Sequence, residues 1–269
     1  MRPTRLGAVG YLNARPLVHG LRDQPSTFTI RYDVPSHCAT LLHEGTIDLG
    51  MIPAIELLAD PDYLVVPGAA IGSDGPVTSV AVYTKRPTEA IRSIALDSSS
   101  RTSAALLKIL CADRFRIQPT FSTMAPNIDA MLSVCDAALI IGDNALFLDH
   151  EAAGLRKIDL GEEWTAMTGL PFVWAFWVGR RGAASPKVVR ALNTARADGV
   201  LQAEAIARDY VKGDPGHYAV AARYLTRDIK FGLGARELNG LQRYYEAAAE
   251  LAIVPKCRRP EFFDGTDRS

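Results

Sequence analysis

The feature that most constrains this chain is a regular alternation of short apolar segments with helical ones. Residues 5–9, 28–32 and 49–52 have the apolar character of buried strands, and residues 36–44 have the spacing of an amphipathic helix. Alternation of this kind is typical of a mostly parallel sheet with covering helices. The sequence therefore predicts an α/β fold.

A second block with the same pattern starts near Lys85. Its predicted strands are residues 93–96, 120–123 and 137–141, and residues 101–115 form its strongest predicted helix. Because the pattern repeats on both sides of a break, we expect two α/β lobes rather than one.

Two further segments of strand character, residues 79–83 and 172–178, flank the middle block. We therefore expect the chain to cross between the lobes twice, with residues 1–84 and 177–269 in the first lobe and residues 85–176 in the second. Ligands of open α/β sheets bind at the carboxyl ends of strands, beside helix N-termini. The cleft between the lobes is the predicted binding site.

The overall charge and the apolar segments exclude several classes of partner. Thirty basic and thirty acidic residues cancel, so the chain lacks the basic excess of a nucleic-acid binder. The longest apolar stretch, residues 170–178, is too short to cross a bilayer, and the N-terminus has no signal-peptide pattern. We expect a cytoplasmic protein that binds a small molecule and neither nucleic acid nor membrane.

Cofactor motifs are also missing from the sequence. The four cysteines are isolated from one another, the five histidines have no metal-binding spacing, and neither a P-loop nor a dinucleotide fingerprint occurs. We expect no metal and no other cofactor.

The hydroxyl-rich segment 97–103 is the strongest local signal of a site. It follows a predicted strand and opens a predicted helix, where free N–H groups and the helix dipole attract anions. Plain N-capping is the alternative, but five hydroxyl residues exceed what one cap requires. We predict a carboxylate or phosphate site, and its candidate ligands are Ser99, Ser100, Thr102 and Ser103.

Three other polar residues stand at strand ends, and local pattern leaves two roles open for each. Asn13 either presents its amide to the cleft or caps the next helix. Ser79 begins a strand after a turn rich in glycine and proline, and it either faces the cleft or is structural. Asp143 follows the strand at 137–141, and it either caps a helix or binds a substrate hydroxyl.

Taken together, the motifs of this chain are similar to those of the MqnA family of menaquinone biosynthesis. The resemblance runs from Arg5 to about Leu251, and each motif stands in the family's order and spacing. The motifs are Gly-Tyr-Leu-Asn-Ala-Arg-Pro-Leu (10–17), Asp-Gly-Pro-Val-Thr-Ser (74–79), Ser-Ser-Ser-Arg-Thr-Ser (98–103), Ile-Gly-Asp-Asn-Ala-Leu (141–146) and Thr-Gly-Leu-Pro-Phe-Val-Trp-Ala (168–175).

The resemblance implies a two-lobed periplasmic-binding-protein type II fold with a ligand cleft. It implies a hydro-lyase that dehydrates chorismate to 3-[(1-carboxyvinyl)oxy]benzoate in the futalosine route. The family's functional asparagine and serine fall on Asn13 and Ser79, and its carboxylate-binding segment falls on residues 98–103. One departure is Ala54, where many members have serine, and we expect it to remove one substrate hydrogen bond.

Two alternative functions and the identity of the base stay open at this point. The sister dihydroxynaphthoate synthase has a Pro-Asn-Asp-type loop and a histidine where this chain has residues 11–13 and Gly142-Asp143, which disfavours it. A non-catalytic carboxylate-binding protein is permitted by the fold. For the base, the candidates are Asp143 and the enolpyruvyl carboxylate of the substrate, and we favour the second because a carboxylate held beside the proton has a high effective concentration.

Overall fold

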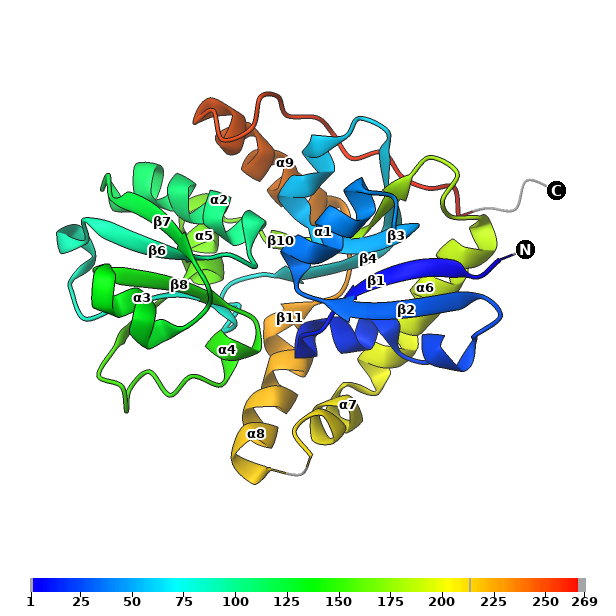
Figure 1. Ribbon diagram of the computed structural model, residues 1–269, viewed down its shortest axis with the longest axis horizontal. Coiled ribbons are helices and arrows are strands. Elements are labelled where there is room, and N and C mark those ends of the chain that lie inside the picture. Colours follow the sequence, from blue (N-terminus) through cyan, green and yellow to red (C-terminus); the bar gives the residue numbers. More distant parts are fainter. Residues whose placement is uncertain (1, 213, 266–269) are drawn as a thin grey trace.

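The computed structural model describes residues 2–212 and 214–265 and shows two mixed sheets side by side (Figure 1). The first sheet has the strand order β11-β4-β10-β3-β1-β2. Its strands are β1 (Thr4–Val9), β2 (Phe28–Asp33), β3 (Leu49–Pro53), β4 (Tyr63–Ser73), β10 (Phe172–Arg180) and β11 (Ile229–Lys230). The second sheet has the order β7-β6-β8-β5-β9. Its strands are β5 (Val80–Thr84), β6 (Ser93–Asp97), β7 (Thr120–Met124), β8 (Ala137–Ile141) and β9 (Arg156–Asp159).

The expectation of mostly parallel sheets is wrong for the strands that follow a lobe crossing. Strands β1, β2 and β3 are parallel, as are β6, β7 and β8. Strand β10 is antiparallel to β3 and β4, and β5 is antiparallel to β8 and β9. The reason is that β5 and β10 enter their sheets from the cleft edge, where the parallel strands end.

Both expected lobe boundaries need correction. The second lobe begins before residue 80 rather than at residue 85, because the whole of β5 pairs within the second sheet. The expected return at residue 177 falls inside β10, whose first residue, Phe172, already pairs with Ser73 of the first sheet. The crossing segments therefore lie ahead of both strands rather than within them.

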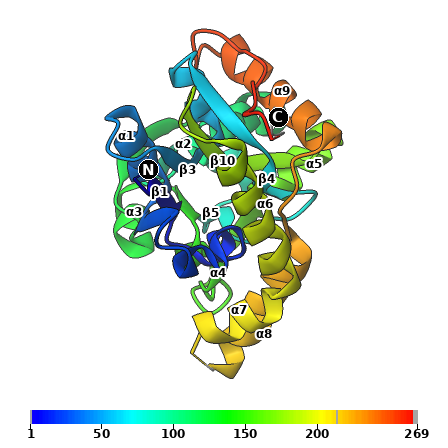
Figure 2. The same cartoon turned by 90° about the vertical axis from the view of Figure 1, so that its right-hand side faces the viewer.

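Helices cover the outer faces of both sheets, and α6, α7 and α8 follow one another along one side of the first lobe (Figure 2). The α-helices are α1 (Pro35–His43), α2 (Arg101–Leu110), α3 (Ile128–Val134), α4 (Asp143–Leu146), α5 (Leu160–Thr168), α6 (Pro186–Leu201), α7 (Ala203–Tyr210), α8 (Pro215–Arg223) and α9 (Ala235–Glu250). Short 3₁₀ and π segments are η1 (Leu12–Val18), η2 (Leu21–Asp23), η3 (Ala54–Ala59), η4 (Thr88–Ala90), η5 (Cys111–Phe115) and η6 (Tyr224–Asp228). Among the described residues, no helix is both long and apolar enough to span a membrane.

One hydrophobic core extends through both lobes. The same cluster of buried side chains contains Leu6 and Phe176 of the first sheet, Ile94 of the second sheet and Leu106 of helix α2. Apolar burial across the boundary, worth about 25 cal/mol per Å², therefore holds the lobes together in addition to the two crossing segments.

The segment η1, which follows β1 at the cleft edge, is held from behind by a close backbone contact. A Cβ atom on Gly199 of α6 would lie 2.1 Å from the carbonyl oxygen of Pro16 in η1. No side chain can occupy that space, so glycine lets α6 and η1 approach each other.

We expect Gly199→Ala to destabilise the protein even though alanine favours helix. In an open helix the change stabilises by up to roughly 1 kcal/mol, whereas overpacking here should lower the free energy of unfolding by about 1–3 kcal/mol. Urea unfolding measures the difference. The control is Gly216→Ala in α8, where the nearest atom lies 3.4 Å away on the side chain of Asp214. Equal stability of the two variants would contradict the prediction.

Candidate active site

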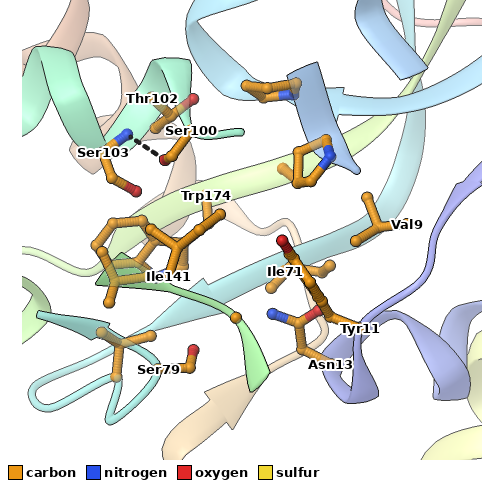
Figure 3. Close-up of a pocket in the computed structure, with 16 residues that line it drawn as sticks. Val9, Tyr11, Asn13, Ile71, Ser79, Ser100, Thr102, Ser103, Ile141 and Trp174 are labelled. Atoms are coloured by element: carbon orange, nitrogen blue, oxygen red, sulfur yellow. Dashed lines mark hydrogen bonds between the residues drawn. The ribbon is translucent and has the colours of Figure 1, made fainter. Parts of the chain in front are cut away.

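A mostly apolar cavity lies between the two sheets. None of the described residues that line it carries a charge. Its polar side chains lie in two groups, with Trp174 and Ile141 between them in Figure 3. One group is Ser100, Thr102 and Ser103, and the other includes Asn13 and Ser79.

The first group is the N-terminus of α2, which follows β6 directly. Ser100 is the N-cap, with extended backbone, and its Oγ accepts a hydrogen bond of 3.3 Å from the Ser103 N–H. The first helical N–H groups have no intrahelical partner, so those of Arg101 and Thr102 are free of helix bonds. Neutral donors and the positive end of the helix dipole thus meet at the cavity, which suits a carboxylate.

Ser99 lies in the predicted motif but outside the cavity lining. Its hydroxyl donates to Asp97 Oδ1 at 2.6 Å and its N–H donates to the same oxygen at 2.9 Å. The Ile141 N–H donates to the other oxygen of Asp97 at 3.2 Å. Burial is the main influence on Asp97 and raises the pKa of that carboxyl group. Ser99 therefore fixes the conformation of the loop. Its hydroxyl proton is already donated to Asp97 and is not available to a ligand.

The second group of polar side chains meets at a buried tyrosine. The Asn13 amide nitrogen donates to the hydroxyl oxygen of Tyr224 at 3.0 Å, and Ser79 Oγ lies 2.5 Å from the same oxygen. Asn13 Oδ1 is buried and has no protein partner. Tyr224 was missed in the sequence analysis because it belongs to none of the motifs at strand ends.

A strained turn directs Ser79 toward the cavity. Thr78 has a left-handed backbone with φ of 64°, which is uncommon for a β-branched residue. The Asp159 carboxylate accepts hydrogen bonds from the N–H groups of Val77 at 3.0 Å and Thr78 at 2.7 Å. A side chain of the second lobe thus holds the crossing segment in the conformation that places Ser79.

Asp143 does not line the cavity, although its motif lies beside it. Its Oδ1 accepts from the Leu12 N–H at 3.1 Å and its Oδ2 accepts from the Tyr210 hydroxyl. Burial is the largest effect on this carboxyl group and raises its pKa, while the two hydrogen bonds oppose the rise. Because Leu12 and Tyr210 belong to the first lobe and Asp143 to the second, the carboxylate joins the lobes.

Two aromatic side chains complete the lining, and the sequence singled out neither as a ligand contact. Trp174 donates its indole N–H to Ser73 Oγ at 3.2 Å. The Tyr11 ring packs on Gly142, where an added Cβ would lie 2.6 Å from it. Ala54, the departure from the expected serine, is fully buried and lies outside the lining.

No group of three His, Cys, Asp or Glu side chains within the described part of the chain is arranged to hold a metal ion. The polar residues that line the cavity offer hydrogen bonds from neutral groups at its two ends. Such a site can hold a carboxylate at α2 and a second polar group at Asn13 and Ser79.

Comparison with known proteins identifies the family. Residues 4–250 match the model of a family described as menaquinone biosynthesis. The chain belongs to this menaquinone biosynthesis family. The resemblance to MqnA proteins seen in the sequence is thereby confirmed.

A curated chorismate dehydratase from Thermus thermophilus is 29% identical to this member of the family over 264 residues. The match covers 92% of this chain and 96% of the relative. The similarity therefore extends over both lobes.

Solved structures show the fold of this family member. Protein AF1704 from Archaeoglobus fulgidus has a TM-score of 0.77 at 17% identity, covering 94% of this chain and 99% of that one. The aliphatic sulphonate binding protein SsuA from Escherichia coli has a TM-score of 0.67 at 18% identity, covering 100% and 96%. The two-lobed periplasmic-binding-protein fold expected from the sequence is confirmed.

Substitutions at Ser100 separate helix capping from anion binding. Ser100→Ala removes the cap and should lower the free energy of unfolding by about 1 kcal/mol. Ser100→Asp keeps a capping oxygen and should unfold closer to the parent protein, but its negative charge should abolish binding of a small carboxylate such as benzoate. Calorimetric titration and urea unfolding measure the two effects. Carboxylate binding that survives in Ser100→Asp would show that the helix end is not the anion site.

Proposed function

We propose that this protein is an enzyme, a cytoplasmic hydro-lyase that converts chorismate to 3-[(1-carboxyvinyl)oxy]benzoate and water. The observation that carries the proposal is the pairing of a carboxylate-binding helix end with Asn13 and Ser79 across one uncharged cavity. The chorismate dehydratase of Thermus thermophilus, similar over nearly its full length, supports the choice of substrate.

The proposed reaction is the loss of one proton and one hydroxide from the chorismate ring. Chorismate carries a ring carboxylate conjugated to a diene, an enolpyruvyl ether at C3 and a hydroxyl at C4. When the C3–H bond breaks, its electron pair is delocalised through the diene toward the ring carboxylate. When the C4–O bond breaks, hydroxide leaves and the ring becomes aromatic, which makes the reaction strongly downhill.

The N-terminus of α2 is the proposed binding site for the ring carboxylate. Donors placed there stabilise the negative charge that grows on the carboxylate as the C3 proton leaves. The donors are the hydroxyl groups of Ser100, Thr102 and Ser103 with the free N–H groups of the first turn. Asn13 and Ser79 then orient the enolpyruvyl arm or the leaving hydroxyl.

The substrate's enolpyruvyl carboxylate is the proposed base. The described residues that line the cavity include no Asp, Glu, His or Lys. Both oxygens of Asp143 are occupied by Leu12 and Tyr210 of the opposite lobe. The enolpyruvyl carboxylate takes the C3 proton, and that proton and the departing hydroxide together form water. Closure of the lobes excludes other water from the reaction.

Purified protein should convert chorismate into a product lighter by one water, without added metal or nucleotide. The motifs of the sequence include none that binds either. Loss of the diene absorbance and the mass of the product measure the reaction. Activity that a chelator removes and zinc restores would contradict the cofactor-free part. Binding of chorismate without turnover would favour the non-catalytic binding protein instead.

Substitution of Asp143 distinguishes the two candidates for the base, Asp143 and the enolpyruvyl carboxylate of the substrate. If Asp143 is the base, Asp143→Asn should lower kcat by about 100-fold or more, the usual scale for general-base loss. We expect a smaller loss, partly in KM, because the carboxylate joins the lobes. Asn13→Ala and Ser79→Ala should each lower kcat further than Asp143→Asn does. A collapse of kcat in Asp143→Asn, with folding and chorismate binding intact, would identify Asp143 as the base.

A further inference from the structure

Tyr224 lies behind the cavity, and its hydroxyl bonds two side chains that line it. The residue begins η6, directly after α8, and its side chain is fully buried. The described hydrogen bonds of its hydroxyl join Asn13, which follows β1, to Ser79, which precedes β5. Asn13 belongs to the first lobe and Ser79 to the end of the first crossing, so Tyr224 fixes their spacing across the lobe boundary.

Three other buried tyrosines are bonded differently. The hydroxyls of Tyr83, Tyr244 and Tyr245 donate to the main-chain carbonyl oxygens of Ala145, Thr102 and Ala54. Each of those bonds satisfies a buried backbone acceptor, which is a structural function. The Tyr224 hydroxyl instead meets two side chains that face the cavity, so its bonds determine what those side chains present to a ligand.

The number of available protons determines which of Asn13 and Ser79 is a hydrogen-bond donor to the cavity and which is an acceptor. Asn13 donates its amide N–H to the Tyr224 oxygen. Because a buried hydroxyl proton needs an acceptor and Ser79 Oγ is the other described partner of this hydroxyl, the single Tyr224 proton is directed to Ser79 Oγ. The Ser79 proton is then free to face the cavity as a donor. Asn13 Oδ1, buried and without a protein partner, remains as an acceptor.

Reversal of the amide gives the complementary result. Tyr224 then donates to Asn13 Oδ1, Ser79 donates to Tyr224, the amide N–H group becomes the donor and Ser79 Oγ the acceptor. In both orientations of the Asn13 amide, one of the two side chains is a hydrogen-bond donor to the cavity and the other is an acceptor. Burial raises the pKa of Tyr224, so its single proton is retained at neutral pH.

We propose that Tyr224 is a positioning residue that makes Asn13 and Ser79 a matched acceptor and donor for the hydroxyl group of the substrate. This assignment rests on the proposed function and adds to it the group that the pair holds. A hydroxyl both donates and accepts, whereas a carboxylate only accepts. Asn13 Oδ1 accepts a hydrogen bond from the C4 hydroxyl, and the Ser79 hydroxyl donates a hydrogen bond to the oxygen of that group as the C–O bond breaks. The donor then stabilises the departing hydroxide.

Tyr224→Phe tests the proposal, with Tyr83→Phe as the matched control. Both changes remove one buried hydroxyl, but only the first releases the cavity-facing pair. We expect Tyr224→Phe to lower kcat for chorismate by roughly tenfold or more with KM within about threefold, because the carboxylate site at α2 is untouched. Tyr83→Phe should keep kcat. Equal kcat in Tyr224→Phe and the parent protein, both folded, would overturn the proposal.

A double-mutant cycle separates positioning from general damage to the fold. If Tyr224 acts through Ser79 and Asn13, then Tyr224→Phe should add little to the loss already caused by Ser79→Ala or by Asn13→Ala. If the fold-losses in kcat multiply in both double mutants, Tyr224 acts independently of Ser79 and Asn13, and the proposal is wrong.

Crystal structures of the parent protein and Tyr224→Phe provide a test that does not depend on turnover. We expect the Asn13 amide to rotate, or Ser79 Oγ to change rotamer, when the shared hydroxyl is removed. Absence of chorismate turnover in the parent protein would refute the proposed function alone. The positioning of the pair is then decided by these structures, and unchanged Asn13 and Ser79 side chains would overturn it.

Discussion

The contact on which the cavity depends is the attachment of the α2 N-terminus to the opposite lobe. Thr102 Oγ1 accepts from the Ile55 N–H at 3.2 Å, and the Thr102 carbonyl accepts from the Tyr244 hydroxyl at 3.0 Å. Arg101 adds an ion pair of 2.9 Å with Glu56. Because α2 follows β6 of the second sheet, these bonds fix the hydroxyl-rich helix end against the first lobe. These bonds therefore help to set the separation between the two polar groups of the cavity.

Contacts between the two lobes also close the far end of the cavity. Asp143 of the second lobe is bonded by Leu12 and Tyr210 of the first, and Tyr11 packs on Gly142 beside it. Charged groups are thus used to join the lobes around the cavity rather than inside it. The consequence is that only neutral donors and acceptors face the ligand.

Much of the site could be predicted because its motifs sit at strand ends. Asn13, Ser79 and Ser100 were predicted from that position, and the structure places all three in the cavity lining. Ser99 and Asp143 stand in the same motifs but face other partners. Local pattern identifies the loop but does not give the direction of a side chain. Ser99 turns back to Asp97, two residues before it, and Asp143 faces Tyr210, which is 67 residues away in the sequence.

Other features had no local signal. Strand β4 was not predicted, since Pro67 and the left-handed Gly68 interrupt its apolar pattern. The direction of β5 and β10 follows from the lobe crossing, which periodicity does not reveal. Tyr224 is one buried aromatic among several, and only the positions of Asn13 and Ser79 around its hydroxyl distinguish it.

A cavity without charge is well suited to the proposed reaction. A lysine or arginine beside the ring carboxylate would already bind the charged substrate strongly, and the part of that binding which the substrate and the transition state share does not raise kcat. Fixed hydroxyl and N–H dipoles in a low-dielectric site respond most where charge develops, and they need no reorganisation during the reaction. A base supplied by the substrate avoids burying a protein carboxylate that has no partner. The protein then has to hold two ends of one molecule at a fixed distance, which is what a two-lobed binding fold already does.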